Sequence, residues 1–394
     1  MSNAPPVIVV VGSGLAGFGV LRELRKLSPD AKLVLVTQEA GHFYSKPALS
    51  TALAKGKTAA TLVTTPAERM IAKLRIDARV GREAEAIDCA SKVLLTTGGP
   101  IQYDALVLAT GATPLRPPIG GEAAHRAISI NQLDDYARFR DELVEDARVL
   151  VIGSGLVGTE FANDLITSGH AVAVVDLLPT PLGQLVPRVV GEDLRETMAA
   201  AGVEWHLGRK LEALGYRDDS KSGYVARLDD GSVIEADIVL SAVGLRPEVA
   251  LAAEAGLDVG TGIKVDEHGR TSDPFIYAIG DCAEYPHGLS AYVMPIMAAA
   301  RGIAPSALGT PTPIRFPALS VQVKTTLLPI NLLPPPRGAT GQWRTLESDA
   351  EGGSHVFEDA DGRVQGYVLT RGKCEQRTQM DQLVMNGQRL GEPA

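Results

Sequence analysis

The stretches VIVVVGSGLAG at residues 7–17 and VLVIGSGLVG at residues 149–158 decide the fold of this chain. In each, an apolar strand runs into a GxGxxG loop. The first glycine permits a tight turn, the second lets backbone N–H groups approach a pyrophosphate, and the third allows close helix–strand packing. The predicted phosphate-binding residues are Gly12, Ser13, Gly14, Leu15, Ala16 and Gly17 in the first loop and Gly153, Ser154, Gly155, Leu156 and Gly158 in the second. Two such loops predict two dinucleotides in one chain, an arrangement typical of electron transfer between them.

The similarity of the two halves extends beyond the loops. Each loop precedes a helical segment and a second strand, at residues 33–37 and 171–176, and DALVLATGATP at 104–114 matches DIVLSAVGLRP at 237–247. A duplicated βαβ nucleotide-binding domain explains this repeat. The sequence therefore predicts an α/β protein with two Rossmann-like domains.

The repeat also sets the expected domain limits. The first nucleotide-binding domain should be discontinuous, at 1–115 and 248–310, with the second at 116–247 and a proline- and glycine-rich crossover after residue 114. A small C-terminal α+β domain is expected at 311–394. It should contain a strand at 320–323, a hairpin closed by Asp361-Gly362, and a terminal helix from about residue 375 to 390.

Bulk composition excludes several classes of protein. The 394 residues carry a formal charge of −9, which argues against nucleic acid or an anionic membrane as a partner. No apolar run is long enough to span a membrane, and no secretion signal is evident. Cys89, Cys282 and Cys374 provide neither a disulfide framework nor metal-ligand spacing, so the cytoplasm is the expected location.

The chain resembles the flavoproteins with two dinucleotide-binding domains that oxidise pyridine nucleotides, and within them the rubredoxin reductase branch. Besides the two loops, the resemblance rests on YSKPALS at 44–50, ATG at 109–111, TSDPFIYAIGDC at 271–282, YVMP at 292–295 and VKT at 323–325. It implies that the first loop holds the FAD pyrophosphate and that Thr37 and Gln38 meet the adenosine ribose, where many relatives have an acidic residue. Further FAD contacts implied by the resemblance are Ala84, Thr110, Gly111, Arg116 and Asp281. A helix N-cap is the structural alternative for Asp281.

Lys46 and Glu160 are the predicted catalytic pair. The resemblance implies that Lys46 lies beside the flavin N5, paired with Glu160, so that both also count as FAD contacts. For Lys46 the alternative is a solvated surface charge. For Glu160 it is a position in the first turn of a helix, where the dipole favours a carboxylate.

The second loop is expected to bind NADH, with Gly244 as a further contact. Asp176 ends the following strand, where a carboxylate hydrogen-bonds the 2′-hydroxyl of NADH and repels the 2′-phosphate of NADPH. No arginine immediately follows Asp176 to hold a phosphate. We therefore expect a preference for NADH.

Val293 and Lys324 complete the predicted flavin contacts. Val293 precedes a helix-like run from residue 296 to 300. The resemblance implies that the N-terminus of this helix faces the flavin O2 and N1, and Lys324 would add a positive charge there. Core packing for Val293 and solvent exposure for Lys324 are the alternatives.

The cysteines indicate where the electrons go. No CxxC-type or CxxxxC-type pair exists to take electrons from the flavin, and no cysteine stands early in the first domain. The flavin must then reduce an external one-electron acceptor, and rubredoxin, or a ferredoxin, is the expected partner. Because these proteins are generally acidic, we expect docking through basic residues such as Lys324, Arg315 and Arg337.

Several other functions stay open. The nearest is a ferredoxin reductase of an oxygenase system or a reductase for a flavo-diiron nitric oxide reductase. A regulatory protein that binds FAD and NADH without rapid turnover is a second. A flavin monooxygenase is a third, for which no additional substrate domain is evident.

Overall fold

The computed structural model describes residues 4–318, 320–336 and 338–391. They form two compact units. Unit 1 comprises Met1–Lys46, Ala60–Thr113 and Leu245–Leu319, and unit 2 comprises Pro47–Ala59, Pro114–Gly244 and Ser320–Ala394. Among the described residues, no helix combines the length and the apolar character needed to cross a membrane.

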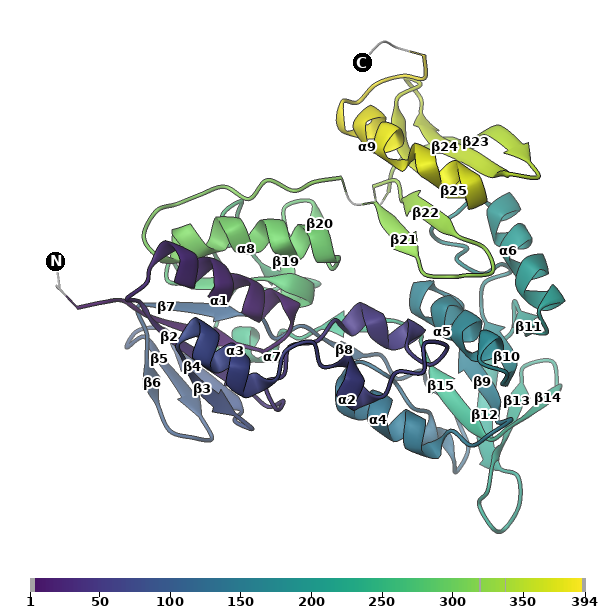
Figure 1. The fold of residues 1–394 in the computed structure, drawn as a ribbon, viewed down its shortest axis with the longest axis horizontal. Helices are drawn as coiled ribbons and strands as arrows, with labels where there is room; N and C mark the ends of the chain where they lie inside the picture. Colours follow the sequence, from purple (N-terminus) through teal and green to yellow (C-terminus); the bar gives the residue numbers. More distant parts are fainter. Residues whose placement is uncertain (1–3, 319, 337, 392–394) are drawn as a thin grey trace. The chain divides into compact units, whose positions relative to one another are not determined.

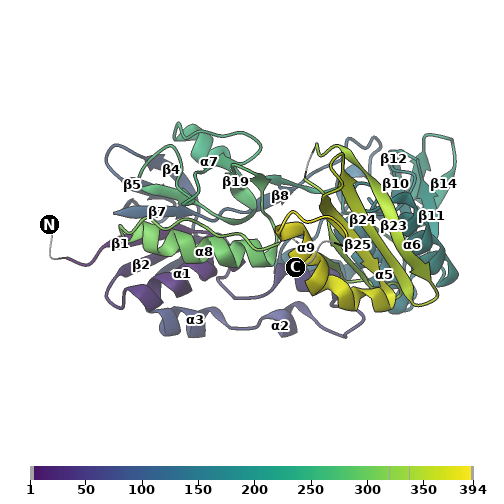
Figure 2. The ribbon, with the colours of Figure 1, turned by 90° about the horizontal axis from the view of Figure 1, so that it is seen from above.

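Unit 1 is built on a five-stranded sheet in which every neighbouring pair is parallel, in the order β18-β7-β1-β2-β3. The strands are β1 (Val7–Val11), β2 (Lys32–Thr37), β3 (Ile76–Val80), β7 (Ala105–Leu108) and β18 (Ile276–Ala278). Helices α1 (Leu15–Leu27) and α8 (Val293–Ala307) pack side by side against it, as Figures 1 and 2 both show. Strands β1, β2, β7 and β18 are almost wholly buried, as expected for continuous apolar runs in a parallel sheet, whereas the edge strand β3 is largely exposed.

Shorter elements complete unit 1. An antiparallel sheet is formed by β4 (Ala84–Asp88), β5 (Val93–Thr96) and β6 (Ile101–Gln102). The others are the 3-10 turn η1 (Lys46–Thr51), which continues into unit 2, α2 (Ala59–Leu62), α3 (Ala67–Leu74), β8 (Ala112–Pro114), β16 (Leu245–Pro247), α7 (Ala250–Glu254), β17 (Ile263–Lys264), η3 (Gly280–Cys282), β19 (Ala283–Tyr285) and β20 (Gly288–Leu289).

Unit 2 contains the second copy of this design. Its parallel sheet has the order β11-β10-β9-β15. Its elements are β9 (Arg148–Ile152), β10 (Ala171–Asp176), β11 (Glu204–Leu207), β15 (Ile238–Ser241), α4 (Leu133–Glu142), α5 (Leu156–Thr167) and α6 (Arg188–Ala200), with η2 (Ala124–Arg126) and an antiparallel sheet of β12 (Leu211–Tyr216), β13 (Tyr224–Leu228) and β14 (Val233–Ala236). Both main sheets share the strand order of a dinucleotide-binding fold, so the two predicted Rossmann-like domains are confirmed.

The C-terminal part of unit 2 is an antiparallel sheet in the order β21-β22-β25-β24-β23 with one helix. The elements are β21 (Val321–Val323), β22 (Ile330–Leu333), β23 (Gly341–Asp349), β24 (Gly352–Asp359), β25 (Val364–Thr370), η4 (Arg371–Gln376) and α9 (Arg377–Met385). The predicted hairpin at Asp361-Gly362 is confirmed, since β24 pairs with β25 across it. The terminal helix is shorter than predicted. It begins after η4 and ends before Gly387, whose φ of +60° breaks the helix.

Candidate functional site

The first glycine loop joins β1 to α1 by a turn that only glycine can make at two positions. Gly12 has a φ of +108°, and a Cβ there would lie 2.1 Å from the Ala109 carbonyl oxygen. A Cβ on Gly17 would lie 1.9 Å from the Gly12 oxygen, so the first turn of α1 packs directly on the loop. Gly14 differs from both. It precedes α1 with a φ of −72°, and a Cβ there would meet nothing within 4 Å. Its Cα therefore borders open space in front of the helix N-terminus, where anions bind.

The second loop repeats this geometry. Gly153 has a φ of +97° with its missing Cβ 2.7 Å from the Ala242 oxygen, and a Cβ on Gly158 would lie 1.9 Å from the Gly153 oxygen. Gly155, with a φ of −68°, again faces open space. Both loops thus present a helix N-terminus with room for a phosphate.

The two copies differ at the residue that follows the second strand's apolar run. In both, the first loop glycine donates to the carbonyl just before this residue, Gly12 N to Val36 O and Gly153 N to Val175 O, each at 2.8 Å. The equivalent residues are therefore Thr37 and Asp176.

Thr37 and Asp176 hold the loops in different ways. In the first copy the Thr37 hydroxyl lies 2.9 Å from the Ser13 hydroxyl and also accepts from Glu39 N. In the second copy the Asp176 carboxylate accepts from the Ser154 backbone and hydroxyl and from Leu178 N. A negative charge thus stands beside the second loop, and a neutral hydroxyl stands in its place beside the first.

Lys46 begins η1 in unit 1, and its electrostatic partner within that unit is Asp281. Burial raises the pKa of the Asp281 carboxyl, and the positive charge of Lys46 lowers it. Asp281 is the second residue of the 3-10 turn η3, whose N-cap is Ile279. The alternative prediction that Asp281 is an N-cap is therefore wrong. Lys46 and Asp281 therefore lie within electrostatic range of each other in unit 1.

Glu160 is the most heavily engaged carboxylate of unit 2. Only 6% of its side chain is exposed. Its Oε1 accepts from Lys324 N at 3.0 Å and Lys324 Nζ at 3.1 Å, and its Oε2 accepts from Lys324 Nζ at 2.9 Å and Ser50 Oγ at 2.5 Å. Sequence reasoning paired Glu160 with Lys46. Within unit 2 its partners are Lys324 and Ser50. The sequence analysis did not single out Ser50, although it stands four residues after Lys46 in the resembling segment.

The predicted positions of Glu160 and Val293 relative to their helices need correction. Glu160 is the fifth residue of α5, one position past the first turn, because α5 begins at Leu156. Its carboxylate is bound by the backbone and side chain of Lys324 and by the side chain of Ser50 rather than by free N–H groups at the helix end. Val293 does not precede the helix but is the first residue of α8, and it is 40% exposed, so core packing does not explain it.

The remaining predicted residues lie at loop and strand ends. Thr110 donates its hydroxyl hydrogen to the Glu248 carbonyl at 3.0 Å, and Gly111 and Gly244 have φ values of +73° and +109°. Ala84 begins β4, whereas Gln38 and Arg116 are exposed.

The three cysteines are free thiols. Cys282 is fully buried and donates weakly to the Leu108 and Ile279 carbonyls, and burial raises the pKa of its thiol. Burial also raises the pKa of the Cys89 and Cys374 thiols. Since the thiolate is the reactive form, none of the three resembles a redox-active cysteine.

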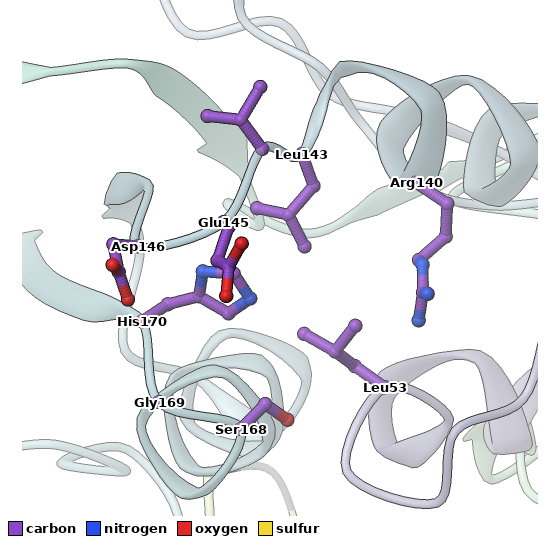
Figure 3. A pocket seen from close by; sticks show the side chains of 9 residues that line it. Leu53, Arg140, Leu143, Glu145, Asp146, Ser168, Gly169 and His170 are labelled. Carbon is purple, nitrogen blue, oxygen red and sulfur yellow. The ribbon is translucent and has the colours of Figure 1, made fainter.

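Unit 2 also contains a pocket of about 300 Å³ that lies apart from every predicted site residue (Figure 3). It is lined by Leu53, Arg140, Leu143, Val144, Glu145, Asp146, Ser168, Gly169 and His170. The Arg140 Nη1 and His170 Nδ1 atoms are buried without a hydrogen-bond partner in the described structure. Because the two exposed carboxylates of Glu145 and Asp146 share this pocket with the two nitrogens, it does not favour one ligand charge.

Comparison with known proteins identifies the family. Residues 6–302 match the family described as pyridine nucleotide-disulphide oxidoreductase, and residues 313–384 match the rubredoxin binding C-terminal domain. The chain belongs to the pyridine nucleotide-disulphide oxidoreductase family. The resemblance inferred from the glycine loops is thereby confirmed, and FAD and NADH are the cofactors that this family and the two open loops imply.

Similar proteins include a rubredoxin-NAD(+) reductase of Alcanivorax borkumensis, which is 40% identical over 92% of this chain and 94% of that protein. A nitric oxide reductase FlRd-NAD(+) reductase of Aeromonas salmonicida is 34% identical over 92% of each protein. Among solved structures, a covalent putidaredoxin reductase–putidaredoxin complex superposes with a TM-score of 0.88 at 27% identity, covering 98% of this chain and 94% of that one. These pyridine nucleotide-disulphide oxidoreductases span nearly the full length of this chain.

Asp176 predicts how this oxidoreductase discriminates between nucleotides. A 2′-phosphate beside this carboxylate would meet a like charge at ~4 Å, which costs roughly 1–4 kcal/mol, or about five- to a thousandfold in affinity. We therefore expect kcat/KM for NADH to exceed that for NADPH by a factor in this range. Steady-state kinetics with both nucleotides checks this, and comparable values would contradict it. Asp176→Asn keeps a hydrogen-bond acceptor for Ser154 but removes the negative charge. We expect it to lower the ratio of kcat/KM for NADH to kcat/KM for NADPH.

Proposed function

We propose that this chain transfers electrons from NADH through FAD to a one-electron iron protein, with rubredoxin as the first choice. The observation that carries the proposal is the combination of two open phosphate cradles at Gly14 and Gly155 with a C-terminal domain of the rubredoxin-binding type. The free, high-pKa thiols support it, because they offer no relay between flavin and acceptor.

The residues present fit both cofactors. Open space beside Gly14 and Gly155 lets a pyrophosphate come within hydrogen-bonding distance of the loop N–H groups. For FAD we propose Gly12, Ser13, Gly14, Leu15, Ala16, Gly17, Thr37, Gln38, Lys46, Ala84, Thr110, Gly111, Arg116, Glu160, Asp281, Val293 and Lys324. For NADH we propose Gly153, Ser154, Gly155, Leu156, Gly158, Asp176 and Gly244. The proposed domains are those of the sequence analysis.

Bound FAD supplies the chemistry, because it accepts two electrons from NADH and can release them one at a time. The protein's residues bind, orient and balance charge. Lys46 places a cation beside Asp281, and Glu160 holds Lys324 in a fixed position. The N-terminus of α8, at Val293, is the positive end of the helix dipole and would stabilise negative charge on a reduced flavin ring placed before it.

The acceptor is expected to dock through exposed positive charge. Arg315 of unit 1 is exposed and suits this role. Lys324 is less suited, because its ammonium is already paired with Glu160. Arg337 lies outside the described residues.

Rubredoxin reduction should therefore slow as salt is added. Contacts between exposed charges are screened over about 10 Å at 0.1 M ionic strength. We expect kcat/KM for rubredoxin to fall several-fold between about 0.01 and 0.3 M salt, and Arg315→Ala to flatten the dependence. The rate of flavin bleaching by NADH is the control, since it should respond far less. A flat salt profile would count against electrostatic docking.

The acceptor itself is settled by direct assay. Purified protein, NADH and a panel of rubredoxins, flavorubredoxins and ferredoxins separate the three reductase functions by kcat/KM. The similarity to the Aeromonas salmonicida enzyme is the reason to include flavorubredoxin. A protein that binds FAD and NADH but bleaches slowly and reduces none of these acceptors would instead fit the regulatory binder.

With NADH as donor and three unpaired thiols, we infer a cytoplasmic location.

A further inference from the structure

One face of α5 binds two segments that are far apart in the sequence. Glu160 accepts from Ser50 and from Lys324. One turn later, Asp164 accepts from Leu53 N at 2.8 Å and Ala54 N at 3.1 Å. Because positions four apart lie on the same side of a helix, these two carboxylates hold residues 50–54 along α5.

Asn163 fixes the second segment in the same way. Its Oδ1 accepts from Thr326 N at 3.0 Å and Leu327 N at 3.1 Å, and its Nδ2 donates to the Thr326 hydroxyl. Glu160, Asn163 and Asp164 are all at most 4% exposed. Burying a polar side chain costs free energy unless hydrogen bonds satisfy its polar atoms, and all three side chains have such bonds here. These contacts are therefore part of what stabilises the fold of unit 2.

Glu160 is the point where the two segments meet. A carboxylate has about four acceptor positions. Here Oε1 is taken by Lys324 N and Nζ, and Oε2 by Lys324 Nζ and Ser50 Oγ. If Lys324 were the only donor, its flexible side chain could move around the Glu160 carboxylate without fixing the orientation of that carboxylate. A second donor on a different segment, Ser50, restricts this motion. Ser50 is 4% exposed, and its other acceptor, the Pro47 carbonyl, is at 3.4 Å against 2.5 Å for Glu160.

We propose that Ser50 is a positioning residue for electron transfer from NADH, acting through Glu160. Its hydroxyl fixes the carboxylate plane of Glu160, which in turn fixes the Lys324 ammonium. The inference rests on the proposed function, because it assumes that Glu160 and Lys324 serve the flavin and nicotinamide.

The test is Ser50→Ala, read by stopped-flow bleaching of bound FAD over a range of NADH concentrations. A hydrogen bond to a charged group is worth about tenfold or more in rate when it acts on the reaction. We expect the limiting bleaching rate to fall about tenfold while the NADH concentration at half-maximal rate changes little. A purely structural role would not produce this split. The control is Thr51→Val, which removes a neighbouring buried hydroxyl that does not contact Glu160, and it should bleach like the parent protein.

A double-mutant cycle with Glu160→Gln shows whether Ser50 acts through Glu160. In the Glu160→Gln background, Ser50→Ala should change the limiting rate little. Urea unfolding of the apoproteins gives an independent reading, in which the two substitutions should be clearly non-additive. An unchanged limiting rate in Ser50→Ala, or additive effects in either cycle, would overturn the proposal. Both assays omit the iron protein, so a parent protein that is bleached by NADH but reduces no rubredoxin would instead refute the proposed acceptor.

Discussion

Gly14→Ala is expected to yield a folded protein that no longer retains FAD. A methyl group at this position meets no protein atom within 4 Å, and a φ of −72° suits alanine, so the chain itself is not strained. The methyl would instead occupy the space that a pyrophosphate needs in order to reach the loop N–H groups. Losing two charge-assisted hydrogen bonds of about 1.5–3 kcal/mol each weakens FAD binding by about a hundred- to ten-thousandfold. The flavin absorbance of the purified protein and FAD titration of the apoprotein measure this.

Two matched variants control the Gly14 result. Gly155→Ala should keep its yellow colour and lose affinity for NADH, because the same open space occurs in the second loop. Gly17→Ala should fail to fold, since its Cβ would lie 1.9 Å from a backbone oxygen. Gly14→Ala protein that is folded and still yellow would show that FAD does not use this loop.

Lys46→Ala is expected to slow the bleaching of bound FAD by NADH about ten- to a hundredfold, the value of a charged hydrogen bond of about 1.5–3 kcal/mol. Lys46 is the cation that lowers the pKa of the partly buried Asp281 carboxyl. Lys46→Arg keeps the charge and should recover most of the rate, whereas unchanged kinetics in Lys46→Ala would remove Lys46 from the mechanism.

The same variant has a stability signature. The folded-state pKa of Asp281 already lies above its ordinary value because of burial. The folded state therefore binds this proton more tightly than the unfolded state does, and stability falls as pH rises from the ordinary value through the raised one. Without Lys46 the raised pKa should increase further, so that the fall extends to higher pH. Urea unfolding of both proteins between about pH 4 and 8 measures the difference, and Asp281→Asn should abolish it.

Local sequence was sufficient for the two nucleotide-binding loops. Each loop is specified by residues that are adjacent in the sequence. These are a run of buried apolar residues, a glycine with positive φ and a glycine packed on the turn. For this reason β1 and β10 begin and end at the predicted residues. The ends of two helices were predicted less accurately. The start of α8 at Val293 depends on where the preceding loop ends, and the early end of α9 depends on the turn at Gly387.

The sequence alone determined the duplication, the family and the expected chemistry, because each is encoded in short motifs whose glycines and carboxylates have local geometric roles. Only the tertiary structure decided the partners of Glu160. Ser50 and Lys324 lie more than a hundred residues from it on either side, and nothing in their local sequence marks that meeting. A buried carboxylate takes whichever donors the packed segments bring to it, and that choice is made by the fold as a whole.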